Sequence, residues 1–234
     1  MPQSHDFLTP LTPSSPRDAA RPLFAAAGLL YLVIIACGVW SEGIARGALI
    51  IPGAPEATQA AIAAAPGMWA LSIAADLAML LADVAIAAVF LHLFSASSPL
   101  LAPLAFALRL VQAALIGAAL LPLTLAPRLS PALLDHAIAL HGLGYDLGLI
   151  FFAVNCAVMA VMLRRARLAG RLLPLGLAGS GAVYLAGSLT ALFAPTLNAA
   201  MQPAYALPLL AETGFCLWLI TRGLRRPRAA PQAA

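Results

Sequence analysis

The chain has 234 residues, of which 62% are hydrophobic and only 9% are charged, and its mean hydropathy is +0.94. Soluble domains carry about 25% charged residues, so this composition excludes a soluble enzyme, a disulfide scaffold and a disordered chain. The net charge is +4, and all thirteen basic residues are Arg. These Arg residues cluster where hydrophobic runs end, which is typical of a membrane protein and argues against nucleic acid as a partner.

In chain order, six apolar segments are long enough to cross a bilayer whose hydrocarbon core is about 30 Å thick. They cover residues 22–41, 68–94, 99–122, 132–163, 172–193 and 204–222. A short interfacial helix is expected over residues 56–65. The fourth segment is longer than a bilayer requires, so either its outer turns project beyond the membrane or it breaks near Gly142 and Gly144. The pattern predicts an all-α, polytopic transmembrane helix bundle of about six spans over residues 21–223.

The two ends of the chain are polar. Residues 1–20 are rich in Pro, Ser and Thr and predict a disordered N-terminal tail, while residues 224–234 predict a basic, flexible C-terminal tail. No cleavage pattern follows the first apolar segment, which we expect to remain as an anchor. Ten Arg residues fall on the side of the two termini and two on the other side, so both termini are predicted to be cytoplasmic. An Arg-rich, Lys-free chain is typical of GC-rich bacteria, which predicts a multi-pass protein of a bacterial plasma membrane surrounded by the lipid bilayer.

Charged residues inside spans are costly, at about 2.5–3.5 kcal/mol each near the centre of the membrane. Counted from the inner ends of their spans, Asp83, Arg109 and Glu212 lie at one level near the middle. A tight connection joins spans two and three, so these helices are predicted to be antiparallel neighbours. We therefore expect Asp83 and Arg109 to form an ion pair, with Glu212 as a second candidate partner and Gln112 one turn above.

Two further acids, Asp76 and Asp146, lie at a level nearer the outside. Four intramembrane acids then face one Arg, so about three carboxyls lack a basic partner. Burial disfavours the charged form of a carboxyl, and protonatable carboxyls are what a proton relay requires. This count favours a proton-linked small-molecule carrier in which Asp76 or Asp146 exchanges protons with the outside. The alternative is a structural clamp, because polar residues also hold transmembrane helices together.

The fourth span carries a second group of polar residues. His141 and Tyr145 share one helical face, and Asp146 lies about 140° around the helix from His141. These residues are candidates for catalysis, with His141 and Tyr145 as an acid/base pair acting on a lipid or hydrophobic small molecule. The alternative is a buried, hydrogen-bonded histidine at a helix contact.

No cofactor or metal is expected. His92 and His141 lie near opposite ends of their spans, which disfavours a b-type heme, and no spacing resembles a zinc site. No nucleotide-binding or nucleophile motif is present. The three cysteines, Cys37, Cys156 and Cys216, are expected to be small apolar residues inside spans rather than disulfide partners.

Several short motifs follow the spans in order. They are AGLLYL at 27–32, IPGAPEAT at 51–58, ADL at 75–77 with Asp83, RLVQAA at 109–114, GLIFF at 148–152, GAVY at 181–184, AET at 211–213 and LWL at 217–219. Two of them share a GxxY pattern, which is either a faint parallel repeat or a coincidence in an Ala- and Gly-rich chain. Together the motifs resemble a family of bacterial membrane proteins, the domain-of-unknown-function 4386 family, over about residues 21–223.

The resemblance implies a multi-helix membrane fold and no activity. It places five residues on family motifs: Asp76, Asp83, Arg109, Gln112 and Glu212. Asn155 stands where the family usually has His after the paired Phe, so the resemblance supports no metal or acid/base role at that position.

Three functions follow as alternatives. A carrier predicts a polar cavity open to one side, with Asp76, Asp83 and Arg109 on its wall. A membrane enzyme predicts that His141, Tyr145 and Asp146 converge beneath a lateral opening. A structural or regulatory subunit predicts a dry bundle with no pocket. We favour an intramembrane polar site over a purely structural role, without naming an activity.

Overall fold

A computed structural model of the chain describes residues 20–225, so the tails predicted over residues 1–20 and 224–234 lie almost entirely outside it. Within this range the regular structure is helical, and six helices are long and apolar enough to cross a membrane. The predictions of an all-α fold and six spans are therefore confirmed for the described residues.

The helices lie where the apolar segments were predicted, but three spans are longer: the first continues to Leu49, the third continues to Arg128 and the sixth begins at Pro195. Their bounds are α2 Arg21–Gly38, η1 Val39–Arg46, α3 Gly47–Leu49, α4 Pro55–Ala64, α5 Pro66–Phe94, α6 Leu101–Ala119, α7 Leu121–Leu125, η2 Ala126–Arg128, α8 Pro131–Arg165, α9 Leu172–Phe193, α10 Pro195–Met201, η3 Gln202–Tyr205 and α11 Ala206–Leu224. Six of the α-helices begin at or next to a Pro, whose fixed φ suits the first turn. The fourth span is one unbroken helix, α8, and the predicted short helix is α4.

The first span is longer than predicted. Helix α2 continues through a π-helical segment, η1, into α3, so the span ends at Leu49 rather than near residue 41. Ser41 and Arg46 lowered the hydropathy of this stretch, yet both are fully buried inside the bundle. A polar stretch can extend a span when its side chains face other helices instead of lipid.

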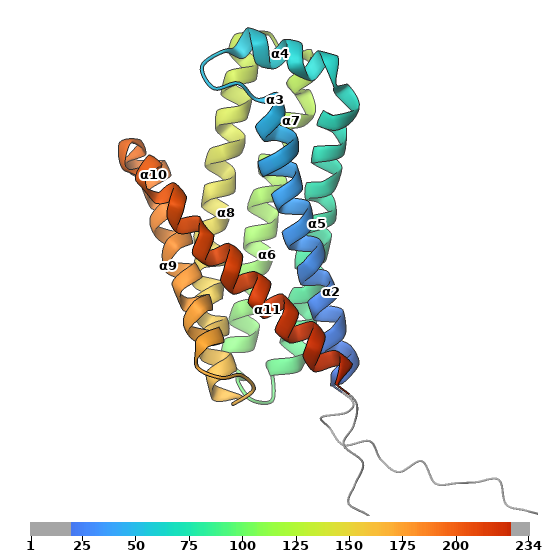
Figure 1. Cartoon of the computed structure of the whole chain (residues 1–234), viewed down its shortest axis with the longest axis vertical. Helices are drawn as coiled ribbons and strands as arrows, with labels where there is room; N and C mark the ends of the chain where they lie inside the picture. The colour runs from blue at the N-terminus through green and yellow to red at the C-terminus, as the bar shows by residue number, and fades with distance from the viewer. Residues whose placement is uncertain (1–19, 226–234) are drawn as a thin grey trace, which may run out of the picture.

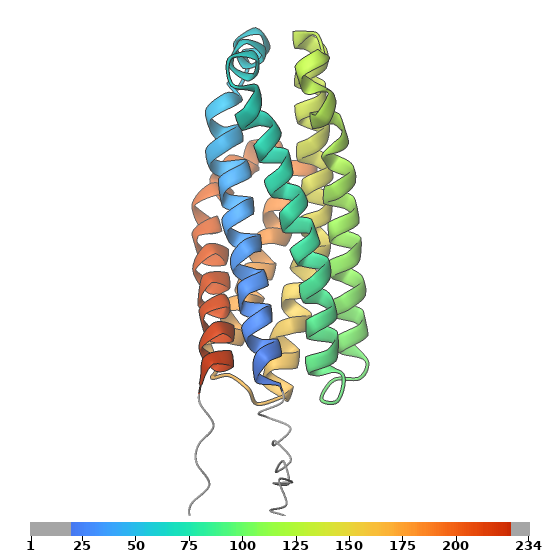
Figure 2. The ribbon, with the colours of Figure 1, turned by 90° about the vertical axis from the view of Figure 1, so that its right-hand side faces the viewer.

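The six spans form a closed ring. Each of α2, α5, α6, α8, α9 and α11 packs against the next in that order, and α11 returns to α2. Both ends of the described chain lie at one end of the bundle, the terminal end, and α4 crosses the opposite end, the α4 end (Figures 1 and 2). Helices α9 and α11, joined through α10 and η3, stop short of the level of α4 (Figure 1).

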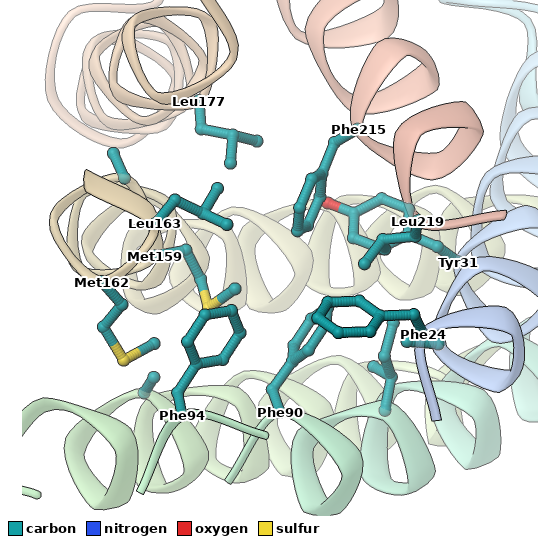
Figure 3. Packing of buried hydrophobic residues seen from close by; sticks show 14 of the residues in the cluster. Phe24, Tyr31, Phe90, Phe94, Met159, Met162, Leu163, Leu177, Phe215 and Leu219 are labelled. Atoms are coloured by element: carbon teal, nitrogen blue, oxygen red, sulfur yellow. The ribbon is translucent and has the colours of Figure 1, made fainter. Parts of the chain in front are cut away.

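Two apolar cores occupy the two ends of the ring. The core at the terminal end is rich in Phe and Met side chains, including Phe90, Phe94 and Phe215 (Figure 3). The core at the α4 end gathers around Trp69, whose indole N–H donates to the carbonyl oxygen of Leu123 at 3.0 Å. The buried polar residues described below lie in the part of the ring between these two cores.

Candidate functional site

A cavity of about 400 Å³ lies inside the ring, and all six spans contribute to its wall. Its size falls in the range of sites for small molecules. The polar part of the wall consists of Glu42, Asp83, Arg109, Gln112, Tyr145, Tyr184, Tyr205 and Glu212. The apolar part includes Ile34, Ile35, Val39, Met79, Ile116, Leu149, Phe152 and Leu209. A cavity lined in this way suits a molecule that has both an apolar body and a polar group.

We place the mouth of the cavity between η1 and the first turns of α11, where the exposed residues of its wall lie. At this mouth Val39 is 48% exposed, Leu209 is 51% exposed and Gly43 is exposed. Helices α2 and α11 touch closely at the terminal end, where Gly28 packs against Ile220, and they diverge toward the α4 end (Figure 1). The mouth therefore faces the apolar flank of the bundle, where a bilayer would lie.

Asp83 and Arg109 form the predicted ion pair at the base of the cavity. The Nε and Nη2 atoms of Arg109 lie 2.8 and 2.6 Å from Oδ1 of Asp83, and both side chains are almost fully buried. The amide nitrogen of Gln112 donates to Oδ2 of Asp83 at 3.3 Å. Oε1 of Gln112, in a side chain that is 5% exposed, has no hydrogen-bond partner in the protein. This prediction is confirmed, including the position of Gln112 beside the pair.

Glu212 also lines the cavity, and its hydrogen-bond partners are two tyrosines rather than Arg109. Tyr31 donates to Oε2 at 2.9 Å and Tyr184 donates to Oε1 at 2.6 Å. Arg109 instead lies over the rings of Tyr31 and Phe152, at 5.5 and 5.2 Å from their centroids. Glu212, the second candidate partner of Arg109, joins no ion pair within residues 20–225, so Asp83 is the partner of Arg109. The two tyrosines are the last residues of the two GxxY motifs.

A second buried network lies nearer the α4 end. Nη2 of Arg46 contacts Oδ2 of Asp76 and Oε1 of Glu42, each at 2.5 Å, and Ser41 donates to Oδ1 of Asp76 at 2.5 Å. Arg46 is one of the two Arg residues assigned to the side opposite the termini, and the count of one Arg for four acids left it out. It is buried in the bundle and is the basic partner of Asp76, so that count is wrong. The cause is the longer first span, which carries Arg46 into the bundle. Asp76 is fully buried in this network and is not part of the cavity wall.

His141 belongs to that network rather than to a catalytic group. Its Nδ1 lies 3.0 Å from the carbonyl oxygen of Ala119, and its Nε2 lies 2.9 Å from Oε1 of Glu42. A carbonyl only accepts, so Nδ1 is the nitrogen that donates to Ala119, and Nε2 faces the carboxyl group of Glu42. Tyr145 touches the His141 ring edge-on at 5.8 Å, without a hydrogen bond between them. Asp146 is half-buried and outside the cavity wall, so the predicted convergence of these three residues is wrong.

Asp76→Asn is expected to lower the free energy of unfolding by about 2 kcal/mol, because it removes a charge-assisted hydrogen bond from the buried Arg46. Glu42 still contacts Arg46, which limits the loss. Asp146→Asn is the matched control and is expected to change it by less than about 0.5 kcal/mol, because Asp146 joins no ion pair in the described chain. Reversible unfolding in mixed SDS and maltoside micelles measures both; equal effects would contradict the assignment of Asp76 to this network.

Sequence reasoning missed several residues of the site: Tyr31, Ser41, Glu42, Arg46, Tyr184 and Tyr205. The i,i+4 spacing of Glu42 and Arg46 was a usable signal for a helical ion pair. For Tyr31 and Tyr184 the shared GxxY pattern was a signal, although it did not indicate that both bind Glu212. Over residues 20–225, no group of three or more His, Cys, Asp or Glu side chains is placed to hold a metal ion.

Comparison with known proteins gives one match. The model of a family described as "Domain of unknown function (DUF4386)" matches residues 26–223. Neither a curated protein nor a solved structure matches the chain. The matched range contains the whole cavity wall and both buried networks.

Proposed function

We propose that the protein, which belongs to the DUF4386 family, binds a small amphipathic molecule in its intramembrane cavity. Membership of this family does not itself indicate an activity. The molecule enters sideways from the bilayer and places its polar end against Asp83, Arg109, Gln112 and Glu212. The single observation that carries this proposal is the cavity itself, which has a polar base, apolar walls and a lateral mouth.

A proton-linked carrier is the activity that we assign to this binding. Glu212 is almost fully buried in the wall and has no ion-pair partner among residues 20–225. A buried carboxyl without a basic partner is a group that binds a proton when the site is empty. A second pair of groups that can share a proton, His141 and Glu42, lies beside the mouth. Proton-binding groups at the base and at the mouth of one cavity support coupling of ligand movement to protons.

The orientation of the carrier follows from its Arg residues. We propose that both termini are cytoplasmic and that the membrane is a bacterial plasma membrane, because ten Arg residues belong to the side of the termini. The mouth of the cavity then faces the outer leaflet. An enzyme is the weaker candidate because both ring nitrogens of His141 are already engaged.

Gly43→Trp is expected to weaken ligand binding by about tenfold or more, because the indole fills the mouth of the cavity. A Cβ at Gly43 meets no atom within 4 Å, so the substitution does not disturb packing at the backbone. The probe is tritiated dodecanol, and binding to purified protein in maltoside micelles is measured by scintillation proximity.

Gly142→Trp is the matched control. Gly142 is also an exposed helical glycine whose added Cβ meets no atom within 4 Å, and it is not part of the cavity wall. We expect this variant to bind dodecanol as the wild type does. Equal binding by the two Trp variants would show that the cavity is not the binding site.

A further inference from the structure

The cavity has a balance of charge and hydrogen-bonding groups that selects among amphipathic molecules. Its wall holds three carboxyl groups, Glu42, Asp83 and Glu212, and one guanidinium, that of Arg109. Glu42 contacts Arg46, which it shares with Asp76, and also His141, while Asp83 pairs with Arg109. Glu212 is the wall carboxyl that no ion pair within residues 20–225 balances. A buried carboxylate without a counter-charge is costly, and a ligand cation would remove that cost.

The cavity wall offers acceptor positions that no donor of the protein fills. Each oxygen of Glu212 accepts one tyrosine hydroxyl, and a carboxylate has about four acceptor positions. Oε1 of Gln112 is an acceptor that has no partner in the protein. The single guanidinium of Arg109 is paired with Asp83 and lies over the rings of Tyr31 and Phe152, so its positive charge is already balanced within the protein. This arrangement fits a ligand head that donates hydrogen bonds or carries positive charge.

Aromatic rings in the wall favour the same kind of ligand. Tyr184 and Tyr205 lie with their ring centroids 6.0 Å apart, and Tyr184 also donates to Glu212. The faces of such rings attract ammonium groups, and they do so most strongly where water is excluded. A carboxyl and two tyrosines on one wall therefore form a site for a substituted ammonium group.

From these observations we propose that the ligand is a lipophilic cation, an amine or quaternary ammonium whose charged nitrogen lies against Glu212 and whose apolar body lies along the walls of Ile35 and Leu149. This inference rests on the proposed function and names its substrate class. Binding of the cation exchanges it for the proton on Glu212, so charge in the cavity stays balanced in both states. The exchange makes affinity depend on pH even for a ligand that cannot itself titrate.

The test compares three dodecyl probes on the wild type and on Glu212→Gln. The probes are dodecyltrimethylammonium, dodecanol and dodecanoate, each radiolabelled and measured by scintillation proximity in maltoside micelles. Each probe is compared with itself between variants, so its partition into micelles cancels. Glu56→Gln is the matched control, because Glu56 is exposed on α4 and lies outside the cavity wall.

We expect Glu212→Gln to weaken binding of dodecyltrimethylammonium by about tenfold or more and to leave dodecanol binding unchanged, which also shows that the variant is folded. We also expect the wild type, and not the variant, to bind the quaternary probe more weakly as pH falls. If the variant binds the cation as well as the wild type does, or if the wild type prefers dodecanoate, the cation assignment is overturned while the proposed function stands. If the wild type binds none of the three probes, the proposed function fails and the inference fails with it.

Discussion

Arg109→Gln is expected to lower the free energy of unfolding by about 3–5 kcal/mol, because it leaves the charge of Asp83 buried without a partner. Asp83 is almost fully buried. Nε of Arg109 donates a hydrogen bond to its Oδ1, and Nη2 of Arg109 lies 2.6 Å from the same oxygen. Gln112 remains as the only donor to Oδ2 among the hydrogen bonds of the described chain, and an amide supplies no charge. Reversible unfolding in mixed SDS and maltoside micelles measures the change.

Two further variants separate the ion pair from a general effect of losing Arg. Arg128→Gln is the matched control and is expected to cost less than about 0.5 kcal/mol, because Arg128 is exposed. The double variant Asp83→Asn with Arg109→Gln is expected to regain part of the lost stability, since it removes both charges. A double variant that is no more stable than Arg109→Gln alone would contradict a direct pairing. The charge-exchanged double variant, Asp83→Arg with Arg109→Asp, is a stricter test, because it too must be more stable than either single variant if the two residues pair directly.

Gly28→Ala is expected to lower the free energy of unfolding by about 2–3 kcal/mol, although Ala is the better helix former. A Cβ at residue 28 would lie 2.8 Å from the backbone nitrogen of Ile220 and 2.5 Å from its Cγ1. A backbone atom cannot move away as a side chain can, so α2 and α11 must separate where they cross. Unfolding in mixed micelles again measures the effect.

Gly214→Ala is the matched control for this contact. Gly214 lies in α11 as well, and a Cβ there meets no atom within 4 Å. We expect this substitution to be neutral or to stabilise the protein by up to about 1 kcal/mol, because Ala favours the helix. A Gly28→Ala variant as stable as Gly214→Ala would show that α2 and α11 are not in close backbone contact at Gly28.

Most of the fold could be predicted from hydropathy, because a span must be apolar over about 20 residues. The predicted bounds of the fifth span, 172–193, are those of α9. The first span shows where this reasoning fails. Glu42 and Arg46 are polar in sequence, but they lie on one side of the helix, where Arg46 contacts both Glu42 and Asp76. A hydropathy average does not distinguish such a buried network from the end of a helix.

The candidate site was predictable where it depends on neighbouring spans. Asp83 and Arg109 could be paired because a tight connection makes α5 and α6 antiparallel and because both residues lie ten or eleven positions from it. The contacts of Glu212 join α2, α9 and α11, which are distant in sequence. Their geometry depends on how each helix is rotated about its axis, and the number of residues along a span does not determine that rotation.

Each buried Arg pairs with an acid on a span adjacent in the chain: Arg46 of η1 with Asp76 of α5, and Asp83 of α5 with Arg109 of α6. During synthesis, therefore, each of these two Arg residues needs only the next or the preceding span to be neutralised. An isolated charge costs about 2.5–3.5 kcal/mol at the centre of a span, so helices that enter the bilayer as hairpins avoid much of that cost. Glu212 is different, because it arrives on the last span and meets Tyr31 of the first. Formation of that contact completes the ring, so the polar base of the cavity is assembled only when the entire chain has been inserted.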